Sequence, residues 1–339
     1  MNHILHVTVS LGAILATSLV SPAAAQTAAE FYKGKTISLV IGFSPGGGYD
    51  TYGRLLAKHL GNHIPGKPNI IVQNLPGAGS LNAVRQLMAT QPKDGTVITH
   101  FNPGVITDSL TDPEKIKVNF SEVAWVGSIT RDFRVCYVWH TTGMKNWDDV
   151  KARKEVIFGG TAKGAGSYVN GAILRNVFDI KLRHVLGFPG SAEQRLATER
   201  GELDGDCGSW SSIPDNWIAE KKIVPFVSYA EVVSEDMPKD IPYIATFAKN
   251  DEQKSILNIL GAAGELGRPF IMNKAVPADR LDAIRKAFDE TMKDPAFLSE
   301  AKTQGLPVVP INGKDAEKII ANIYASDPAL IAKAKAALE

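Results

Sequence analysis

Short runs of apolar, β-branched residues alternate along the chain with segments whose apolar positions recur every three to four residues. The first run, 36–43, is almost continuously apolar, which predicts a strand buried on both faces. A glycine-rich turn follows, and from Asp50 the apolar residues fall on one face of a predicted helix. The unit returns at 69–73, where a strand is followed by a turn and by a helix that Ser80 caps. Strands that alternate with helices in this way predict parallel βαβ units.

The same alternation continues to the end of the chain and sets the expected domains. Further strands are expected at 96–99, 124–127, 155–158 and 183–187, and further helices near 279–292, 295–304 and 314–338. The chain that follows residue 25 is too long for one ordinary hydrophobic core, so two domains are expected. We place domain 1 at 26–128 plus 231–339, and domain 2, inserted into it, at 129–230. The expected fold class is α/β.

The first 25 residues differ from the rest. The stretch 4–20 is mostly apolar, and the small residues Ala23-Ala24-Ala25 after it are of the type that a signal peptidase requires. A membrane-spanning helix is the alternative, but the run is short and Pro22 follows it closely. We therefore expect a signal peptide at 1–25, cleaved after about Ala25, and an exported periplasmic protein.

Charge and the sparse metal-binding residues exclude several classes of partner. There are 37 Lys and Arg against 36 Asp and Glu, a formal net charge of +1, with no strongly basic segment. Nucleic acid is therefore not an expected partner. His59 and His63 are four residues apart, but no Glu or Asp joins them as in H-E-x-x-H, and the other histidines are scattered, so no metal and no cofactor is expected. Cys136 and Cys207 lie in predicted strands; a disulfide and two buried thiols both stay open, because the sequence does not give the distance between their Cα atoms.

Three junctions between a strand and a helix are rich in glycine, at 45–48, 76–79 and 164–167. Glycine lets the backbone approach a ligand closely. The helix that follows each junction offers unpaired N–H groups and the positive end of its dipole. Because such junctions meet at the carboxyl edge of a parallel sheet, they predict one shared anion site that needs no lysine or arginine.

An enzymatic interpretation of the first loop is weaker. The loop lacks the Gly-Lys-Ser/Thr of a P-loop and the spacing of a dinucleotide fingerprint. The segment 42–46 does match G-x-S-x-G, the nucleophile elbow of α/β-hydrolases, with Ser44 as the nucleophile. The elbow uses the backbone N–H of the next residue to bind an oxyanion, and that residue is Pro45, which has none. A secreted hydrolase is kept only as an alternative, and we expect that the protein is not an enzyme.

The two N-terminal loops resemble the paired signatures of the receptors of tripartite tricarboxylate transporters, also called Bug proteins. The family signatures read roughly F-x-P-G-G-G-x-D and N-x-P-G-A-G; this chain has FSPGGGYD from Phe43 to Asp50 and NLPGAGS from Asn74 to Ser80. The segment 201–204 is similar to the family's G-x-x-D. The resemblance implies a type II periplasmic binding protein, in which two α/β domains close on a ligand by a hinge.

The resemblance also implies a function and partners. The ligand would be a small carboxylate, either a di- or tricarboxylate or an aromatic acid. A monomeric receptor would deliver this ligand to an inner-membrane permease of the tripartite tricarboxylate type, or to a sensor. A ligand-sensing receptor domain without a transport role is the remaining alternative. The sequence does not name the carboxylate, the permease or the hinge residues.

The junctions and the resemblance together give the expected binding residues. They are Phe43, Ser44, Gly46, Gly47, Tyr49, Asp50, Gly77, Ala78, Gly79, Ser80 and Asn102 in domain 1, and Thr161, Lys163, Gly164, Ser167, Gly190, Ser191 and Trp210 in domain 2. Lys163 departs from the family, which usually has small or polar residues there. Two interpretations of Lys163 stay open: it contacts a carboxylate that the helix ends do not reach, or it is a solvated lysine at the tip of a loop. We expect selectivity to lie around 161–167 and Trp210.

Overall fold

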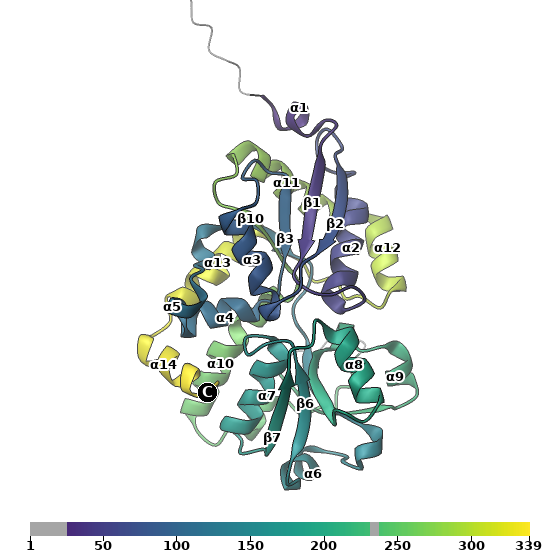
Figure 1. Cartoon of the computed structure of the whole chain (residues 1–339), viewed down its shortest axis with the longest axis vertical. Helices are drawn as coiled ribbons and strands as arrows, with labels where there is room; N and C mark the ends of the chain where they lie inside the picture. The colour runs from purple at the N-terminus through teal and green to yellow at the C-terminus, as the bar shows by residue number, and fades with distance from the viewer. Residues whose placement is uncertain (1–25, 231–236) are drawn as a thin grey trace, which may run out of the picture.

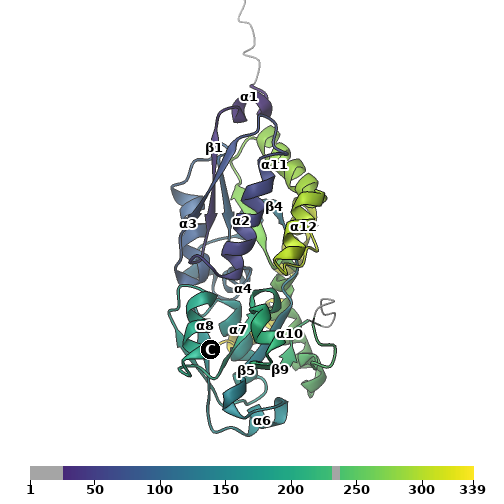
Figure 2. The same ribbon diagram turned by 90° about the vertical axis from the view of Figure 1, so that its right-hand side faces the viewer.

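The computed structural model describes residues 26–230 and 237–339. They form two α/β domains stacked along the long axis of the molecule (Figures 1 and 2), each built on one mixed sheet. The expected signal peptide, 1–25, lies outside the described residues. Within the described part of the chain, no helix combines the length and the apolar character needed to cross a membrane.

The sheet of domain 1 has the strand order β11-β4-β10-β3-β1-β2. In its parallel half, β1 (Thr36–Ile41) lies between β2 (Asn69–Asn74) and β3 (Val97–His100), as the βαβ pattern predicts. In its other half, β10 (Pro269–Asn273) runs antiparallel between β3 and β4 (Val123–Ser128), and β11 (Ile311–Asn312) pairs with β4 at the edge. A strand from late in the chain therefore completes the first sheet.

Helices cover both faces of this sheet with separate apolar cores. One core packs under α2 (Gly48–Leu60), α11 (Ala278–Thr291) and α12 (Pro295–Thr303), beside the short α1 (Ala28–Tyr32). The other packs under α3 (Leu81–Ala89), α4 (Gly104–Thr111), the short α5 (Pro113–Ile116) and α13 (Gly313–Tyr324). The sheet is thus buried on both faces, which accounts for its almost continuously apolar strands.

The sheet of domain 2 has the order β7-β6-β8-β5-β9. β6 (Val156–Gly160) pairs in parallel with β7 (Leu182–Leu186) and β8 (Gly205–Ser209). β5 (Arg134–Trp139) is inserted antiparallel between β8 and β9 (Ile223–Ser228). One face packs against α6 (Trp147–Ala152), α7 (Gly166–Asn176), α10 (Asp251–Ala262) and α14 (Pro328–Ala336). The second face carries α9 (Asp215–Ala219), and α8 (Ser191–Glu199) follows β7.

The division of the chain between the domains differs from the expected one. The expectation places all of 231–339 in domain 1, but α10 and α14 pack into the core of domain 2, through Leu257, Leu260 and Ala334 among others. Figure 1 shows α14 beside α10 in the lower domain. The segment 314–338, expected as one helix, is divided into α13 and α14 because Asp327 caps a new helix that Pro328 begins. The chain crosses between the domains at 129–133, 263–268 and 325–327.

A disulfide joins the middle of the second sheet. Cys136 on β5 lies directly opposite Cys207 on β8, with 3.9 Å between their Cα atoms, and the two form a disulfide bond. The structure thus decides between the two alternatives that the sequence leaves open. The bond links strands that are 71 residues apart in the chain.

We expect the double variant Cys136→Ala/Cys207→Ala to lose about 2–4 kcal/mol of unfolding free energy, because a cross-link that closes a long loop restricts the unfolded chain. Urea unfolding measures the loss. Tryptophan fluorescence follows domain 2 in particular, since Trp139, Trp147, Trp210 and Trp217 all lie there. A urea midpoint equal to that of the oxidised wild type would contradict this prediction.

Candidate functional site

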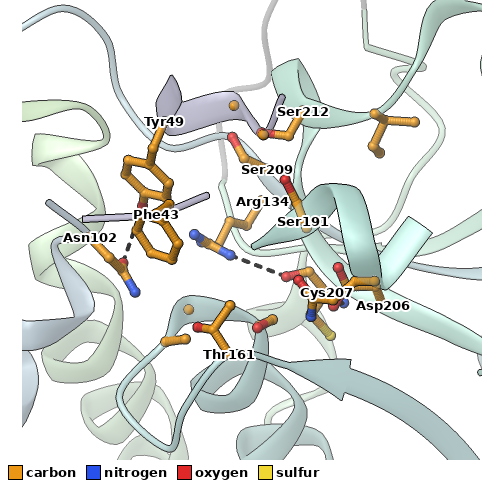
Figure 3. A pocket seen from close by; sticks show the side chains of 18 of the residues that line it. Phe43, Tyr49, Asn102, Arg134, Thr161, Ser191, Asp206, Cys207, Ser209 and Ser212 are labelled. Atoms are coloured by element: carbon orange, nitrogen blue, oxygen red, sulfur yellow. Dashed lines mark hydrogen bonds between the residues drawn. The ribbon is translucent and has the colours of Figure 1, made fainter. Parts of the chain in front are cut away.

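A small cavity lies between the two domains, with a volume of about 60 Å³, the space of only a few water molecules. Domain 1 lines it with the loop 47–49, Phe43, Asn102 and Arg268. Domain 2 lines it with residues of the loop 161–167, the start of α8, and strands β5 and β8. Figure 3 shows these side chains converging from both domains.

Three helices begin at the cavity. They are α2 at Gly48, α7 at Gly166 and α8 at Ser191, and all three of these residues line the cavity. No side chain caps the N-terminus of any of the three. The first turn of an α-helix has N–H groups without helical partners and a partial positive charge. Three such ends around one small space form a site suited to an anion.

Arginine side chains add positive charge that the sequence did not reveal. The guanidinium of Arg134 lies in the middle of the cavity (Figure 3). Its Nε donates to Oδ2 of Asp132 at 2.5 Å, and its Nη1 donates to the carbonyl oxygen of Cys207 at 3.1 Å. Burial lowers the pKa of Arg134, but Asp132, Tyr49 and Asp206 together more than offset this, and the pKa lies above its ordinary value. Arg134 is therefore a fixed cation inside the cleft.

Arg268 connects the two domains at the edge of the same cavity. Its side chain leaves domain 1 at the start of β10 and is 1% exposed. The guanidinium lies 4.5 Å from the ring centroid of Tyr49 and 5.0 Å from that of Tyr52. Its Nη2 donates at 3.1–3.3 Å to three hydroxyls of domain 2, those of Ser209, Ser211 and Ser212. The third arginine of the cavity, Arg195, donates to the carbonyl of Gly46 at 3.0 Å and so also spans the cleft.

Part of the domain 1 wall is aromatic and uncharged. Phe43 stacks on Tyr49 with 4.4 Å between ring centroids, and the hydroxyl of Tyr49 donates to Oδ1 of Asn102 at 3.2 Å. His100 lies behind Tyr49, 5.2 Å away, and its Nδ1 lies 2.8 Å from the carbonyl oxygen of Pro269. Burial lowers the pKa of His100 to about 3, so the imidazole is neutral at physiological pH. This wall suits the apolar body of a ligand.

The structure brings part of the expected site together at the cavity. The expected residues that line it are Phe43, Gly47, Tyr49, Asn102, Thr161, Ser167 and Ser191. Three others lie beside it and contact the facing domain: Ser44 donates to Oε2 of Glu193 at 3.0 Å, Gly46 accepts from Arg195, and Gly190 approaches the Ser44 hydroxyl. Their contacts hold the cleft closed.

Asp50 shapes the first loop and does not line the cavity. The residue is 4% exposed, and its carboxylate accepts from the N–H of Gly46 at 2.9 Å and from Arg54 at 2.8 Å. Asn74, at the end of β2, donates to the same carboxylate and to the carbonyl of Phe43, both at 2.8 Å. The Asn of one signature therefore holds the loop of the other, which gives a physical reason for the two signatures to occur as a pair.

The second glycine junction, 76–79, and Ser80 after it do not line the cavity. A Cβ added at Gly79 would meet Ala162 and Ala165 of domain 2 at 3.4 and 3.7 Å, so this junction touches the opposite domain. The hydroxyl of Ser80 accepts from the N–H of Asn102 at 2.9 Å and thereby supports a residue that does line the cavity. Ala78 and Gly77 lie in the same turn.

Selectivity is expected around 161–167 and Trp210; Thr161 and Ser167 of that region line the cavity, but Lys163 and Trp210 do not. Lys163 is exposed and does not line the cavity. Trp210 is 2% exposed and packs with Tyr137 and Trp217 in the apolar core on the second face of the sheet. Gly164 lies against α4 of domain 1, where a Cβ would overlap the carboxyl of Asp108.

Several lining residues were not identified from the sequence: Arg134, Tyr137, Gln194, Arg195, Asp206, Ser209, Ser212 and Arg268. One signal was available for two of them. Arg134 and Asp206 are charged residues within short strands whose neighbours are buried, and buried charges are rare unless they are paired or functional. No sequence signal marks the arginines at 195 and 268.

The carboxyl group of Asp108, which lies against Gly164 of domain 2, predicts a pH dependence of stability. Burial raises the pKa of its carboxyl to about 7. An unfolded aspartate loses its proton near pH 4, so between these pH values the folded protein binds more protons and its stability falls as pH rises. We expect Asp108→Asn, which cannot ionise, to raise the unfolding free energy by about 1 kcal/mol or more at pH 8 and to change it little at pH 4.

Urea unfolding at pH 4, 6 and 8 measures this difference, with the same exchange at the exposed Asp282 as the matched control. An equal effect of Asp108→Asn at all three pH values would contradict the prediction, because a change of packing alone does not depend on the ionisation of residue 108.

Comparison with solved structures identifies the fold. The periplasmic binding protein BugD superposes with a TM-score of 0.74 at 18% identity, over 90% of this chain and 98% of BugD. MatC from Rhodopseudomonas palustris, solved with bound malate, gives 0.71 at 15% identity, over 90% and 99% of the two chains. A second R. palustris protein, solved with adipate, gives 0.70 at 16% identity, over 88% and 97%. The chain therefore has the two-domain α/β fold of these periplasmic binding proteins.

Comparison of the amino-acid sequence with known proteins gave no match. No family model matches the chain, and no curated protein matches it. Among the described residues, no group of three or more His, Cys, Asp or Glu side chains is placed to hold a metal ion.

Proposed function

We propose that this protein is an exported solute-binding receptor of the tripartite tricarboxylate transporter type, which captures a small carboxylate between its two domains. The observation that carries the proposal is the charge around the cavity. Its charged lining residues are Arg134, Arg195, Arg268 and Asp206, and three minus one leaves +2 when all are ionised. Three uncapped helix N-termini add to this positive potential.

The fold and the loops support the same function. Two of the solved structures that share this fold contain a dicarboxylate, malate in one and adipate in the other. The first loop, 43–50, carries the residues of the family signature and contributes Phe43, Gly47, Gly48 and Tyr49 to the cavity. In this proposal the protein acts in the periplasm as a monomer, without a cofactor, and delivers its ligand to an inner-membrane permease.

A thermal-shift series of mono-, di- and tricarboxylates and aromatic acids tests the proposal. A ligand at 100 times its Kd adds about 2.7 kcal/mol of stability, which raises the melting temperature by several degrees. Uncharged amides of the same acids are the control and should give no shift. If no acid in the series stabilises the protein, the carboxylate-receptor proposal is wrong.

The alternatives predict different results. Ser44 donates its hydroxyl to Glu193 and does not line the cavity, so a hydrolase would have to expose it first. Ester hydrolysis that disappears in Ser44→Ala would favour that enzyme. A sensing receptor would share the cavity but not the permease, and uptake of labelled ligand by cells with and without the protein separates these two roles.

A further inference from the structure

One carboxyl group at the cavity wall, that of Asp206, accepts a single hydrogen bond among the described residues. Asp206 on β8 lines the cavity and is 6% exposed. Its Oδ1 accepts from the backbone N–H of Cys207 at 2.7 Å, and no hydrogen bond to Oδ2 is found among the described residues. Oδ2 is therefore an acceptor open to the cavity, and displacing water from it costs free energy unless the ligand donates to it.

The groups around Asp206 do not fully compensate for the burial of its carboxyl group. Burial raises the pKa of Asp206 to about 7, and the N–H of Cys207 together with the cations Arg134 on β5 and Arg195 on α8 only partly offsets this effect. Tyr137, its partner across the strand pair, also faces it. None of these side chains donates a hydrogen bond to Asp206 in the described structure, so its carboxyl oxygen is available as an acceptor at the cavity wall.

Asp206 also lies next to the main cation of the cavity. Arg134 donates to the carbonyl oxygen of Cys207, while Asp206 accepts from the N–H of that same residue. The guanidinium and the carboxyl are thus held at the two ends of one residue (Figure 3). A ligand whose carboxylate lies on Arg134 would place its neighbouring carbon within reach of Asp206.

From this juxtaposition we propose that Asp206 makes the cavity selective for carboxylates that carry a hydrogen-bond donor, a hydroxyl or an ammonium, close to the carboxylate. The inference rests on the proposed function as a carboxylate receptor and narrows its substrate class. Plain acids of the same skeleton leave the Asp206 oxygen unpaired and bind more weakly. A buried polar group left unpaired is a strong means of rejecting an otherwise isosteric ligand.

Calorimetry at pH 8 with matched triplets tests the proposal. The triplets are propionate, lactate and alanine; succinate, malate and aspartate; and 3-phenylpropionate, 3-phenyllactate and phenylalanine. We expect at least one triplet to bind, with the hydroxy or amino acid bound roughly tenfold or more tightly than the plain acid. Asp206→Ala should abolish this preference while leaving the affinity for the plain acid the same or higher.

A second variant identifies the donor. Asp206→Asn keeps an acceptor oxygen but loses the charge, so a hydroxy acid should keep part of its advantage and an amino acid should lose nearly all of it. Because it preserves the shape of the side chain, it also serves if Asp206→Ala folds poorly. Asp108→Asn, the same exchange at a buried carboxyl outside the cavity, should keep the preference of the wild type.

The possible results distinguish the selectivity of Asp206 from the receptor function itself. Binding of plain and donor-bearing acids with equal affinity, or a preference that survives in Asp206→Ala, overturns the selectivity and leaves the receptor function standing. A complete absence of binding in all three triplets and in the wider acid series overturns both.

Discussion

Replacing Arg134 with glutamine should lower the affinity for the carboxylate by about 25-fold or more. Arg134 is the cation in the middle of the cavity, and its hydrogen bonds to Asp132 and Cys207 fix its position. Removing one partner of a buried ion pair between protein and ligand costs about 2–5 kcal/mol, and each 1.4 kcal/mol is tenfold in affinity. Isothermal titration calorimetry with the acid that gives the largest thermal shift measures the loss.

The same change should destabilise the protein without ligand. Asp132, whose side chain is 2% exposed, would lose its partner and keep a buried charge, which costs about 3–5 kcal/mol. The double variant Asp132→Asn/Arg134→Gln removes both charges and should recover much of the stability but none of the affinity. Arg131→Gln is the control, because Arg131 is half exposed and pairs with Glu265 away from the cavity. If Arg134→Gln binds as tightly as Arg131→Gln, Arg134 does not hold the carboxylate, and the helix ends with Arg195 and Arg268 are sufficient.

The βαβ units could be predicted because their information is local. β1, β2, β3 and β6 are short, largely apolar runs, each followed by a turn and a helix. The antiparallel insertions could not be predicted, since β10 enters the first sheet from a segment about 170 residues after β3 and nothing in its own sequence specifies the pairing. The placement of α14 on domain 2 is likewise decided by packing on α10.

The same contrast holds for the site. A glycine loop and the start of the helix after it are specified by neighbouring residues, so they can be recognised in the sequence. Two of the three expected junctions, 45–48 and 164–167, do contribute lining residues to the cavity. The arginines reach the cavity through long-range strand pairing and domain crossings, which leave no local pattern. Trp210 shows that a residue next to a cavity residue in the sequence need not line the cavity. It lies next to Ser209, which lines the cavity, but successive side chains at a strand end point to opposite faces, and the tryptophan enters the core.

Gly104→Ala should weaken ligand binding by roughly 10- to 100-fold while leaving each domain folded. Gly104 is the first residue of α4 in domain 1, and a Cβ there would overlap the backbone carbonyl oxygen of Gly164 in domain 2. A backbone atom cannot avoid the methyl group by changing rotamer, so the domains could not approach as they do here. Overpacking of this kind costs about 1–3 kcal/mol, and the cost applies only to the closed form.

The contacts across the cleft narrow the cavity to about 60 Å³, so a ligand enters while the domains are apart and is held when they close. Gly104→Ala therefore separates closure from folding. Its melting temperature without ligand should stay near that of the wild type, since alanine is favoured over glycine in a helix. Small-angle scattering should show no contraction when ligand is added. The matched control is Gly261→Ala on α10, a helical glycine with no heavy atom within 4 Å of an added Cβ. If Gly104→Ala closes and binds like Gly261→Ala, the approach of α4 to the loop 161–167 does not limit closure, and the affinity depends on the cavity residues alone.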